Sequence, residues 1–416
     1  MSEQPIKFYN KEELLNESKV FCMFPWLHLN ATPKGDIYPC CSNNYTAPIG
    51  NTKDMSLKEA FNSPQMKQLR LDMLEGKPSK ICDFCYKHEE AGPHSFRHYA
   101  KENFGKYFDE IVPTTQDDGT VEEFKMRYFD IRFSNICNMK CRTCGAEFSS
   151  QWAQENRIYN KNRPIIMHVD NHKGNILNEV LEHVDDMDLA YFAGGEPTLT
   201  EEHYIMLEDM IRKGRTDIVL RYNTNASNLI YKDYDLLDLW KNFNRIELSC
   251  SIDHYGERAE WMRKGTDWGV VESNLKLFRN LDTVLFQINT VFSIFNYLTI
   301  GEFYTYMKDK DLLRSEDWYH SLYLAVHPSY YSAKSLPKEL KELAKNKAKS
   351  FNFGNGEGYP VLTRLVNDAI SFADESHTWK DNKEQFFQHV LAVDRIRGES
   401  FFNTFPELTK LVIATE

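Results

Sequence analysis

Short β-rich runs alternate with longer helical or polar segments from Met126 onward. Apolar, β-branched and aromatic residues dominate six of these runs, near 127–133, 187–193, 217–223, 245–252, 283–292 and 321–326. Strands that are separated by helices form parallel βαβ units, so the pattern predicts an α/β fold, either a barrel or an open sheet. Ligands bind at the carboxyl ends of the strands in such folds, and the polar motifs described below lie at such ends.

The residues on either side of this central part follow other patterns. Apolar residues from Leu57 to Met73 recur at helical spacing, and Pro64 predicts a break or kink in that helix. The polar, turn-rich stretch 111–124 is typical of a linker, and the pattern beyond 331 is mostly helical. The sequence therefore predicts a small module at 1–100, a linker at 101–125, the α/β part at 126–331 and a helical segment at 332–416.

Charge and composition exclude several classes of function. A net charge of -11 argues against general nucleic-acid binding, which depends on Lys and Arg. The polar N-terminus has no apolar region of a secretory signal, and no run approaches the roughly 20 apolar residues that span a bilayer. We therefore expect a cytoplasmic protein without a membrane partner. In that reducing compartment, the nine cysteines are better interpreted as metal ligands or reactive thiols than as disulfides.

Three thiols follow the first strand of the α/β part. Cys137, Cys141 and Cys144 have the spacing Cys-x3-Cys-x2-Cys. A structural zinc site requires a fourth ligand, and the next histidine is the distant His168. An iron-sulfur cluster on three cysteines instead leaves one iron open for a substrate or cofactor. The spacing favours the cluster, with zinc as the alternative.

The run CNMKCRTC resembles the signature of the radical S-adenosylmethionine (radical SAM) superfamily. AGGEPTL, at the end of the second strand, resembles the GGEP motif of the same family. The resemblance implies a partial (β/α)6 TIM-like barrel with a catalytic 4Fe–4S cluster that binds S-adenosylmethionine. It also implies reductive cleavage of that cofactor to a 5′-deoxyadenosyl radical, which abstracts hydrogen from a substrate.

The GGEP motif consists of Gly194, Gly195, Glu196 and Pro197. The family resemblance assigns these residues to cofactor binding. The two glycines allow the backbone to approach the methionine amino group, and Glu196 can accept a hydrogen bond from that ammonium. The alternative is a simple turn after a strand, which Gly and Pro also favour.

Two further strands end in residues that match cofactor contacts of the family. Ser251 and Asp253 match the position that meets the ribose, and Arg263 matches an arginine that pairs with the cofactor carboxylate. Asn223 and Asn225 resemble the Asn-containing turn of the family, with an Asx turn as the alternative. Thr143 stands where many members carry an aromatic residue, so we expect the adenine contact to come from elsewhere.

The N-terminal module carries a second resemblance. Cys22 and Cys40, followed by Cys82 and Cys85, resemble the ligands of a twitch domain, half of a SPASM domain, which holds an auxiliary 4Fe–4S cluster. In most relatives this domain follows the barrel, whereas here it precedes it. A structural zinc ribbon is the alternative. The adjacent Cys41 is open to a role as alternative ligand or hydrogen donor.

These resemblances predict a radical SAM enzyme with two clusters and S-adenosylmethionine as cofactors. Relatives with such domains often act on peptides, so a peptide or protein substrate is expected, with a small metabolite as the alternative. A flavodoxin or ferredoxin is the expected reductant. The rival from another class is a noncatalytic, zinc-organised binding protein.

Overall fold

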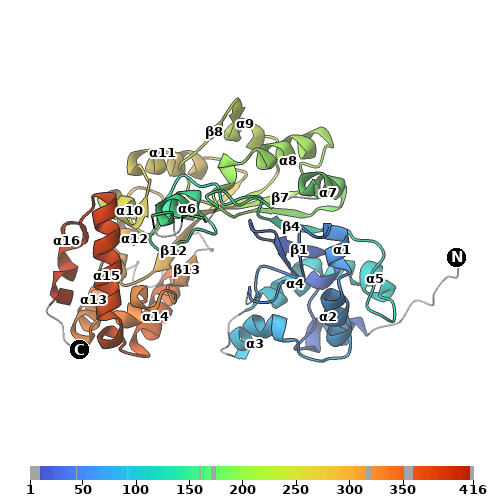
Figure 1. The fold of residues 1–416 in the computed structure, drawn as a ribbon, viewed down its shortest axis with the longest axis horizontal. Coiled ribbons are helices and arrows are strands. Elements are labelled where there is room, and N and C mark those ends of the chain that lie inside the picture. Colours follow the sequence, from blue (N-terminus) through green and yellow to red (C-terminus); the bar gives the residue numbers. More distant parts are fainter. Residues whose placement is uncertain are drawn as a thin grey trace. The chain divides into compact units, whose positions relative to one another are not determined.

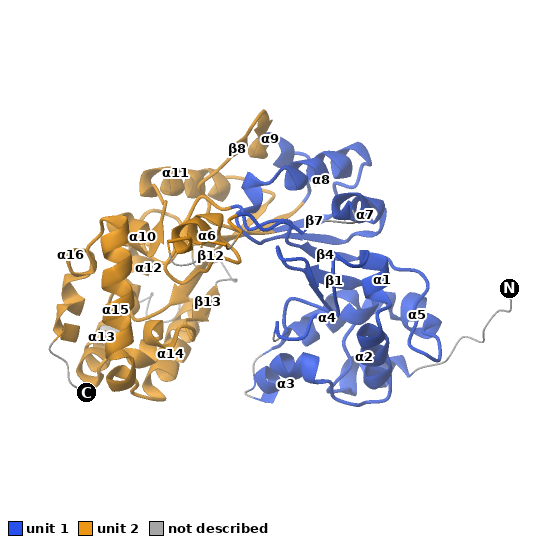
Figure 2. Ribbon diagram, in the orientation of Figure 1, with its two compact units in different colours: residues 1–136, 166–221, 238–244 blue, residues 137–165, 222–237, 245–416 orange. Residues whose placement is uncertain are grey.

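The computed structural model describes residues 10–43, 45–90, 92, 94–158, 161–162, 164–169, 175–314, 321–350 and 359–412. The first part of the polar N-terminus therefore lies outside the described residues. The chain forms two compact units, coloured separately in Figure 2. Unit 1 comprises residues 1–136, 166–221 and 238–244, and unit 2 comprises residues 137–165, 222–237 and 245–416.

All six expected strands are present. They are β4 (Tyr128–Ile131), β6 (Leu189–Phe192), β7 (Val219–Thr224), β10 (Ile246–Ser251), β12 (Val284–Phe292) and β13 (Ser321–Leu324) (Figure 1). The pairs β4–β6, β10–β12 and β12–β13 are parallel. Helices α8 (Glu201–Arg212), α11 (Trp268–Arg279) and α12 (Ile300–Asp309) are among the connecting segments. The expected α/β class with a parallel sheet is thereby confirmed.

The N-terminal module contributes strands to the sheet, which the sequence did not predict. Strands β1 (His28–Ala31), β2 (Asp36–Tyr38) and β3 (Gly50–Asn51) continue the order β6-β4-β1-β2-β3 in unit 1. Strand β1 is parallel to β4, with His28 opposite Tyr128 and Ala31 opposite Ile131, and every residue of both strands is buried. Such pairing joins residues that lie far apart in the chain, so local patterns cannot indicate it.

Helices of the N-terminal module follow their capping residues. The expected break falls between α1 (Leu57–Phe61) and α2 (Pro64–Leu74), because Ser63 caps α2 and Pro64 occupies its first turn. Helices α3 (Asp83–Glu90), α4 (Phe96–Phe104) and α5 (Phe108–Ile111) follow. The structure differs here from the expected linker at 101–125, since Phe104, Phe108 and Ile111 are buried.

The C-terminal segment is helical, as expected. It contains α13 (Lys338–Ser350), α14 (Pro360–Asp374), α15 (Trp379–Arg397) and α16 (Phe401–Thr404). Helix α15 ends at Arg397, and Gly398 directly after it has a φ of 65°, in the left-handed region that favours glycine. The remaining elements of the described residues are β5 (Lys140–Cys141), α6 (Ser150–Asn156), α7 (Ile176–Glu182), β8 (Ile230–Tyr231), β9 (Tyr234–Asp235), α9 (Leu236–Trp240), α10 (Gly256–Met262) and β11 (Arg263–Lys264), with short 3-10 helices and one π-helix (Glu13–Glu17).

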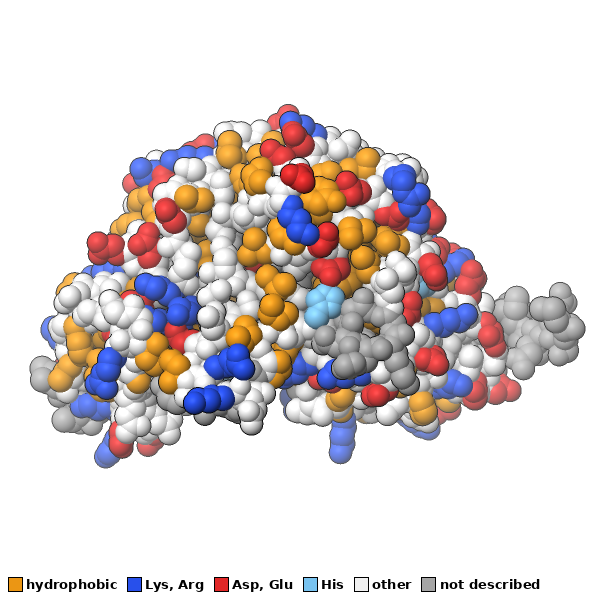
Figure 3. Space-filling model, turned by 45° about the horizontal axis from the view of Figure 1, so that its top comes forward, with side chains coloured by type: hydrophobic (Ala, Val, Ile, Leu, Met, Phe, Trp, Pro, Cys, Tyr) orange, Lys and Arg blue, Asp and Glu red, His pale blue; other side chains and the backbone are white. Residues whose placement is uncertain are grey.

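Charged side chains are scattered among hydrophobic and other atoms on the face of the molecule drawn in Figure 3. Acidic and basic groups are interspersed there, and the described residues form no continuous basic area on that face. Within the described part of the chain, no helix has the length and apolar character needed to cross a bilayer.

Candidate functional site

A two-stranded ribbon brings the three-cysteine loop next to Arg263 in unit 2. Strands β5 and β11 pair antiparallel, with Cys141 opposite Arg263 and Lys140 opposite Lys264. Gly265, directly after β11, has a φ of 106°, and a Cβ there would lie 2.6 Å from the carbonyl oxygen of Asn138. Only glycine therefore permits this close approach of the two chain segments.

The Arg263 side chain lies between a carboxylate and a thiol. Its Nε is 2.8 Å from Oδ2 of Asp253, and its Nη1 is 3.7 Å from Sγ of Cys141. Asp253 is buried and also accepts a hydrogen bond from the backbone N–H of Val291 at 2.8 Å. Burial raises the pKa of the Cys141 thiol, and the positive charge of Arg263 opposes that shift. Arg263 thus partly offsets the effect of burial on this thiol.

Hydrogen bonds to the backbone hold the cysteine loop in place. Ser149 donates from Oγ to the carbonyl of Met139 at 2.6 Å, and Trp152 donates from Nε1 to the carbonyl of Cys141 at 2.6 Å. The pKa of the Cys144 thiol is raised by desolvation and then by the nearby Cys141, which indicates that these two thiols lie close together. Cys141 and Cys144 are thus neighbouring thiols of the loop.

The C-terminal segment binds the same loop through Arg142. This side chain is 1% exposed and donates from Nη2 to Asp394 and to Glu399, each at 2.6 Å. Its guanidinium also stacks over the Trp261 ring at 3.5 Å. The sequence did not predict this role, because the partners of Arg142 lie about 250 residues away in the chain. The only sequence feature that could have indicated this role is the position of a basic residue between two cysteines.

The Gly194–Pro197 turn lies in unit 1, where it packs against the chain before Cys137. The backbone N–H of Glu196 donates to Ile136 at 2.7 Å, and a Cβ on Gly195 would lie 2.1 Å from the Ile136 carbonyl oxygen. Gly195 is thus required because any side chain at this position would collide with the backbone of Ile136. Glu196 is buried and accepts a hydrogen bond from the Thr198 hydroxyl at 3.0 Å.

The other predicted cofactor contacts end strands of unit 2. Asn223 belongs to β7, and Asn225 follows it. Asn225 accepts hydrogen bonds from the backbone and hydroxyl of Ser227 at 3.0 and 2.6 Å, which is an Asx turn, and it donates to Asn138 at 2.8 Å. Ser251 is half-buried at the end of β10, opposite Asn289 of β12. Asn225 thus links its turn to the cysteine loop.

Four thiols of the N-terminal module lie close together in unit 1. Burial raises the pKa of Cys22, and Cys82 and Cys85 raise it further. The pKa of Cys40 is raised by burial, by the adjacent Cys41 and by the other three thiols. The four cysteines that the sequence singled out therefore influence one another electrostatically, and they remain a predicted ligand set. A set of four neighbouring soft ligands fits a cubane, in which each iron takes one thiolate.

Cys41 faces a different environment. Burial and then the carboxylate of Asp130 raise the pKa of its thiol, and Arg132 opposes them. Asp130 is fully buried in β4 and is 3.3 Å from Nε of Arg132. The thiol therefore lies near the ion pair that Asp130 of β4 forms with Arg132, the residue after this strand. Among the described residues, no three His, Cys, Asp or Glu side chains form a group suited to one metal ion.

Two family models match the chain in the predicted order. Residues 22–86 match the iron-sulfur cluster-binding SPASM domain, and residues 131–307 match the radical SAM superfamily. The chain therefore contains a SPASM domain that is followed by a radical SAM domain. These two domains imply 4Fe–4S clusters and S-adenosylmethionine as cofactors. The thiols described above are soft sulfur donors, which is the type of ligand that such clusters bind.

Solved structures resemble this radical SAM protein only distantly. The anSMEcpe enzyme with bound AdoMet and Cp18Cys peptide is 20% identical, with a TM-score of 0.38. The match covers 56% of this chain and 61% of that one. The Streptococcus suis protein SuiB bound to S-adenosylmethionine is 16% identical, with a TM-score of 0.38, and the match covers 71% and 64% of the two chains. None of the curated proteins matches.

Proposed function

We propose that this radical SAM protein binds S-adenosylmethionine on a 4Fe–4S cluster ligated by Cys137, Cys141 and Cys144. The observation that carries the proposal is the ribbon β5–β11, which sets Arg263 and Asp253 beside the cysteine loop in unit 2. When bound, the reduced cluster and its cofactor supply a 5′-deoxyadenosyl radical that abstracts hydrogen from the substrate.

The residues of this site would bind and orient the cofactor. A guanidinium suits a carboxylate because two N–H groups can bond both oxygens, so Arg263 is the proposed partner of the methionine carboxylate. Its ion pair with the buried Asp253 fixes the guanidinium in advance. Ser251, Asp253, Asn223 and Asn225 remain predicted cofactor contacts, as do Gly194, Gly195, Glu196 and Pro197.

The SPASM match supports a second 4Fe–4S cluster on Cys22, Cys40, Cys82 and Cys85. Four thiolates complete the coordination of every iron, so this cluster would not bind S-adenosylmethionine. A role in electron transfer with the substrate is therefore proposed for it. A flavodoxin or ferredoxin is the proposed reductant of the protein.

A peptide or protein is the proposed substrate, because SPASM domains often accompany radical SAM domains that act on peptides. Synthetic peptides encoded next to this gene can test the proposal. A true substrate should stimulate formation of 5′-deoxyadenosine above the rate without substrate. Stimulation by small metabolites and by none of the peptides would instead establish the alternative substrate class.

Cleavage of the cofactor tests the catalytic cluster directly. Dithionite-reduced protein should convert S-adenosylmethionine to 5′-deoxyadenosine slowly even without substrate. Replacing Cys137, Cys141 and Cys144 together with Ala should abolish this product. The matched control is Cys250→Ala, which removes a buried thiol of β10 outside the loop and should retain activity. Product formation by the triple variant would refute the assignment.

A further inference from the structure

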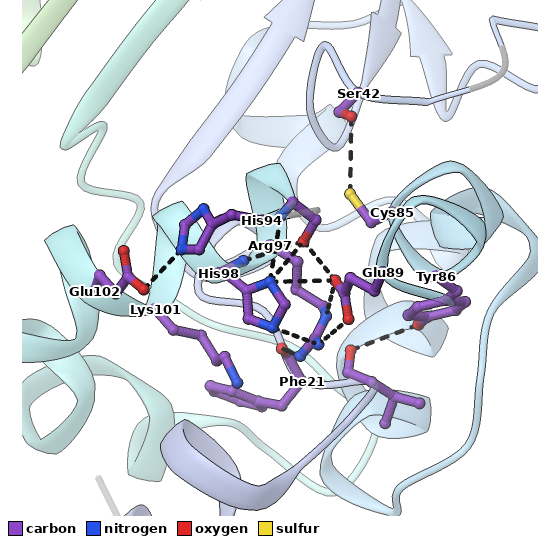
Figure 4. Close-up of polar contacts among 12 residues, drawn as sticks. Phe21, Ser42, Cys85, Tyr86, Glu89, His94, Arg97, His98, Lys101 and Glu102 are labelled. Carbon is purple, nitrogen blue, oxygen red and sulfur yellow. Dashed lines mark hydrogen bonds and ion pairs between the residues drawn. The ribbon is translucent and has the colours of Figure 1, made fainter. Parts of the chain in front are cut away.

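Arg97 connects two segments of unit 1 that carry the cysteines of the N-terminal module (Figure 4). The residue lies in the first turn of α4, just outside the SPASM match, and it is 3% exposed. Nη1 donates to the carbonyl oxygens of Ser18 at 2.9 Å and of Phe21 at 3.1 Å. Phe21 directly precedes Cys22, so this end of the guanidinium fixes the first ligand segment.

The other edge of the guanidinium binds helix α3. Nε of Arg97 donates to Glu89 at 2.9 Å, and Nη2 forms an ion pair with the second carboxylate oxygen. Glu89 lies four residues after Cys85, so both project from the same face of α3. One side chain thereby joins the segment of Cys22 to the helix of Cys85.

The partners of Glu89 hold it as an anion. Burial alone would raise the pKa of Glu89, but hydrogen bonds from Arg97 and from the Ser95 hydroxyl outweigh that effect and lower it. His98 lies 3.8 Å from the same carboxylate. The site therefore contains a buried cation with its own counterion, arranged beside the thiols.

The contacts of Arg97 place its charge near the proposed ligands. Its guanidinium bonds the carbonyl of Phe21, the residue before Cys22, and pairs with Glu89 on the helix of Cys85. A cation near a cluster stabilises the reduced form, which carries one more negative charge, and net charge is a main determinant of cluster potential.

We propose that Arg97 is a positioning residue of the N-terminal cluster, which holds the Cys22 segment against α3 and raises the reduction potential of that cluster. The proposal rests on the proposed ligation of a cluster by this module. Glu89 is the counterion that limits the effect, so the two side chains act on the potential in opposite directions.

Redox titration followed by electron paramagnetic resonance tests this on the full-length, reconstituted protein. Arg97→Gln should shift the potential of the N-terminal cluster to a more negative value, whereas Glu89→Gln should shift it to a more positive one. The potential of the other cluster should stay unchanged in both. Opposite shifts distinguish this role from a merely structural one. If the two side chains only stabilised the fold, the direction of the shift in potential would not depend on the sign of the charge that is removed.

Two matched controls make the same chemical changes in unit 1. Glu102→Gln alters an exposed carboxylate of α4, and Arg127→Gln alters a half-buried arginine that bonds to Glu110. Neither should move the potential. Arg97→Lys should keep the potential near that of the wild type yet lose iron to a chelator faster, because an ammonium cannot span both segments.

Equal potentials in all variants, or shifts of the same sign for Arg97→Gln and Glu89→Gln, overturn the inference. Should Arg97→Gln not fold, the isosteric Glu89→Gln decides alone, and an unchanged or more negative potential counts against the role. Wild-type protein without an N-terminal cluster overturns both this inference and the proposed ligation. Intact clusters without the opposite shifts overturn only the inference.

Discussion

Arg263 is the residue on which the proposed cofactor site most depends. Replacing it with Ala would leave the buried Asp253 without its partner, so Arg263→Lys is the cleaner change. Lysine keeps the charge but cannot bond both oxygens of a carboxylate, so we expect S-adenosylmethionine to bind about tenfold more weakly, or about 1.4 kcal/mol. Equilibrium binding to the reconstituted protein measures this.

The control for Arg263→Lys is Arg245→Lys, whose exposed side chain bonds to Glu247 in the same unit. Its affinity for S-adenosylmethionine should equal that of the wild type. Both variants should retain their full iron content. An unchanged affinity in Arg263→Lys would remove the bidentate carboxylate contact from the proposed site.

Buried histidines should make the protein sensitive to mild acid. Burial lowers the pKa of His203, which packs against Phe192 and Tyr204, to about 3. The unfolded chain takes up a proton below about pH 6.5, whereas the folded one does so only near pH 3. Acid therefore favours unfolding between these values.

Replacing His203 with Phe should reduce this sensitivity. Between pH 7.5 and 5.5, His203 should account for a loss of about 1.4 kcal/mol in the free energy of unfolding. Anaerobic urea titrations at the two pH values give the difference, which should be smaller by about that amount in His203→Phe. The same difference in wild type and variant would contradict the neutral, buried state of His203.

At the level of elements, helix α15 and the residues after it stabilise the cysteine loop. Arg142→Met leaves the buried carboxylates of Asp394 and Glu399 without this partner. We expect it to lower the free energy of unfolding by about 3 kcal/mol or more. Chemical denaturation measures the loss. Arg395→Ala, on an exposed part of the same helix, should change stability by less than about 0.5 kcal/mol.

The sequence predicts elements whose patterns are local. The six strands follow from runs of β-branched and aromatic residues, and the break between α1 and α2 follows from Ser63 and Pro64. The pairing of β1 with β4 and the contact of Arg142 with Asp394 could not be predicted. Both join residues that are distant in the chain, and the same residues could have met other partners.

The candidate site was predictable to a similar degree. The cysteine spacing predicts the ligands, but no local pattern indicates that Arg263 lies opposite Cys141 in a ribbon. Asn225 forms an Asx turn, which was the alternative interpretation, and the same side chain also bonds to Asn138 of the loop. The role of Arg97 could not be predicted, because the side chain bonds to backbone carbonyl groups. Every residue has such a group, so the sequence does not show which ones it would bond to.

For the whole molecule, iron content distinguishes the two metal sites. Reconstituted wild type should contain about eight irons per chain, and the variant with both Cys82→Ala and Cys85→Ala should contain about four. Elemental analysis of iron and zinc measures this. Wild type with about four irons and one zinc would contradict the auxiliary cluster while leaving the catalytic one intact.

The parallel pairing of β1 with β4 also bears on attempts to dissect the protein. The first strand belongs to the SPASM match, and β4 runs up to the start of the radical SAM match. A fragment beginning near residue 126 would expose the backbone groups of a fully buried strand, which invites edge-to-edge aggregation. The boundary between the two family matches is therefore a poor place to cut this chain, and the catalytic part should be produced together with its N-terminal strands.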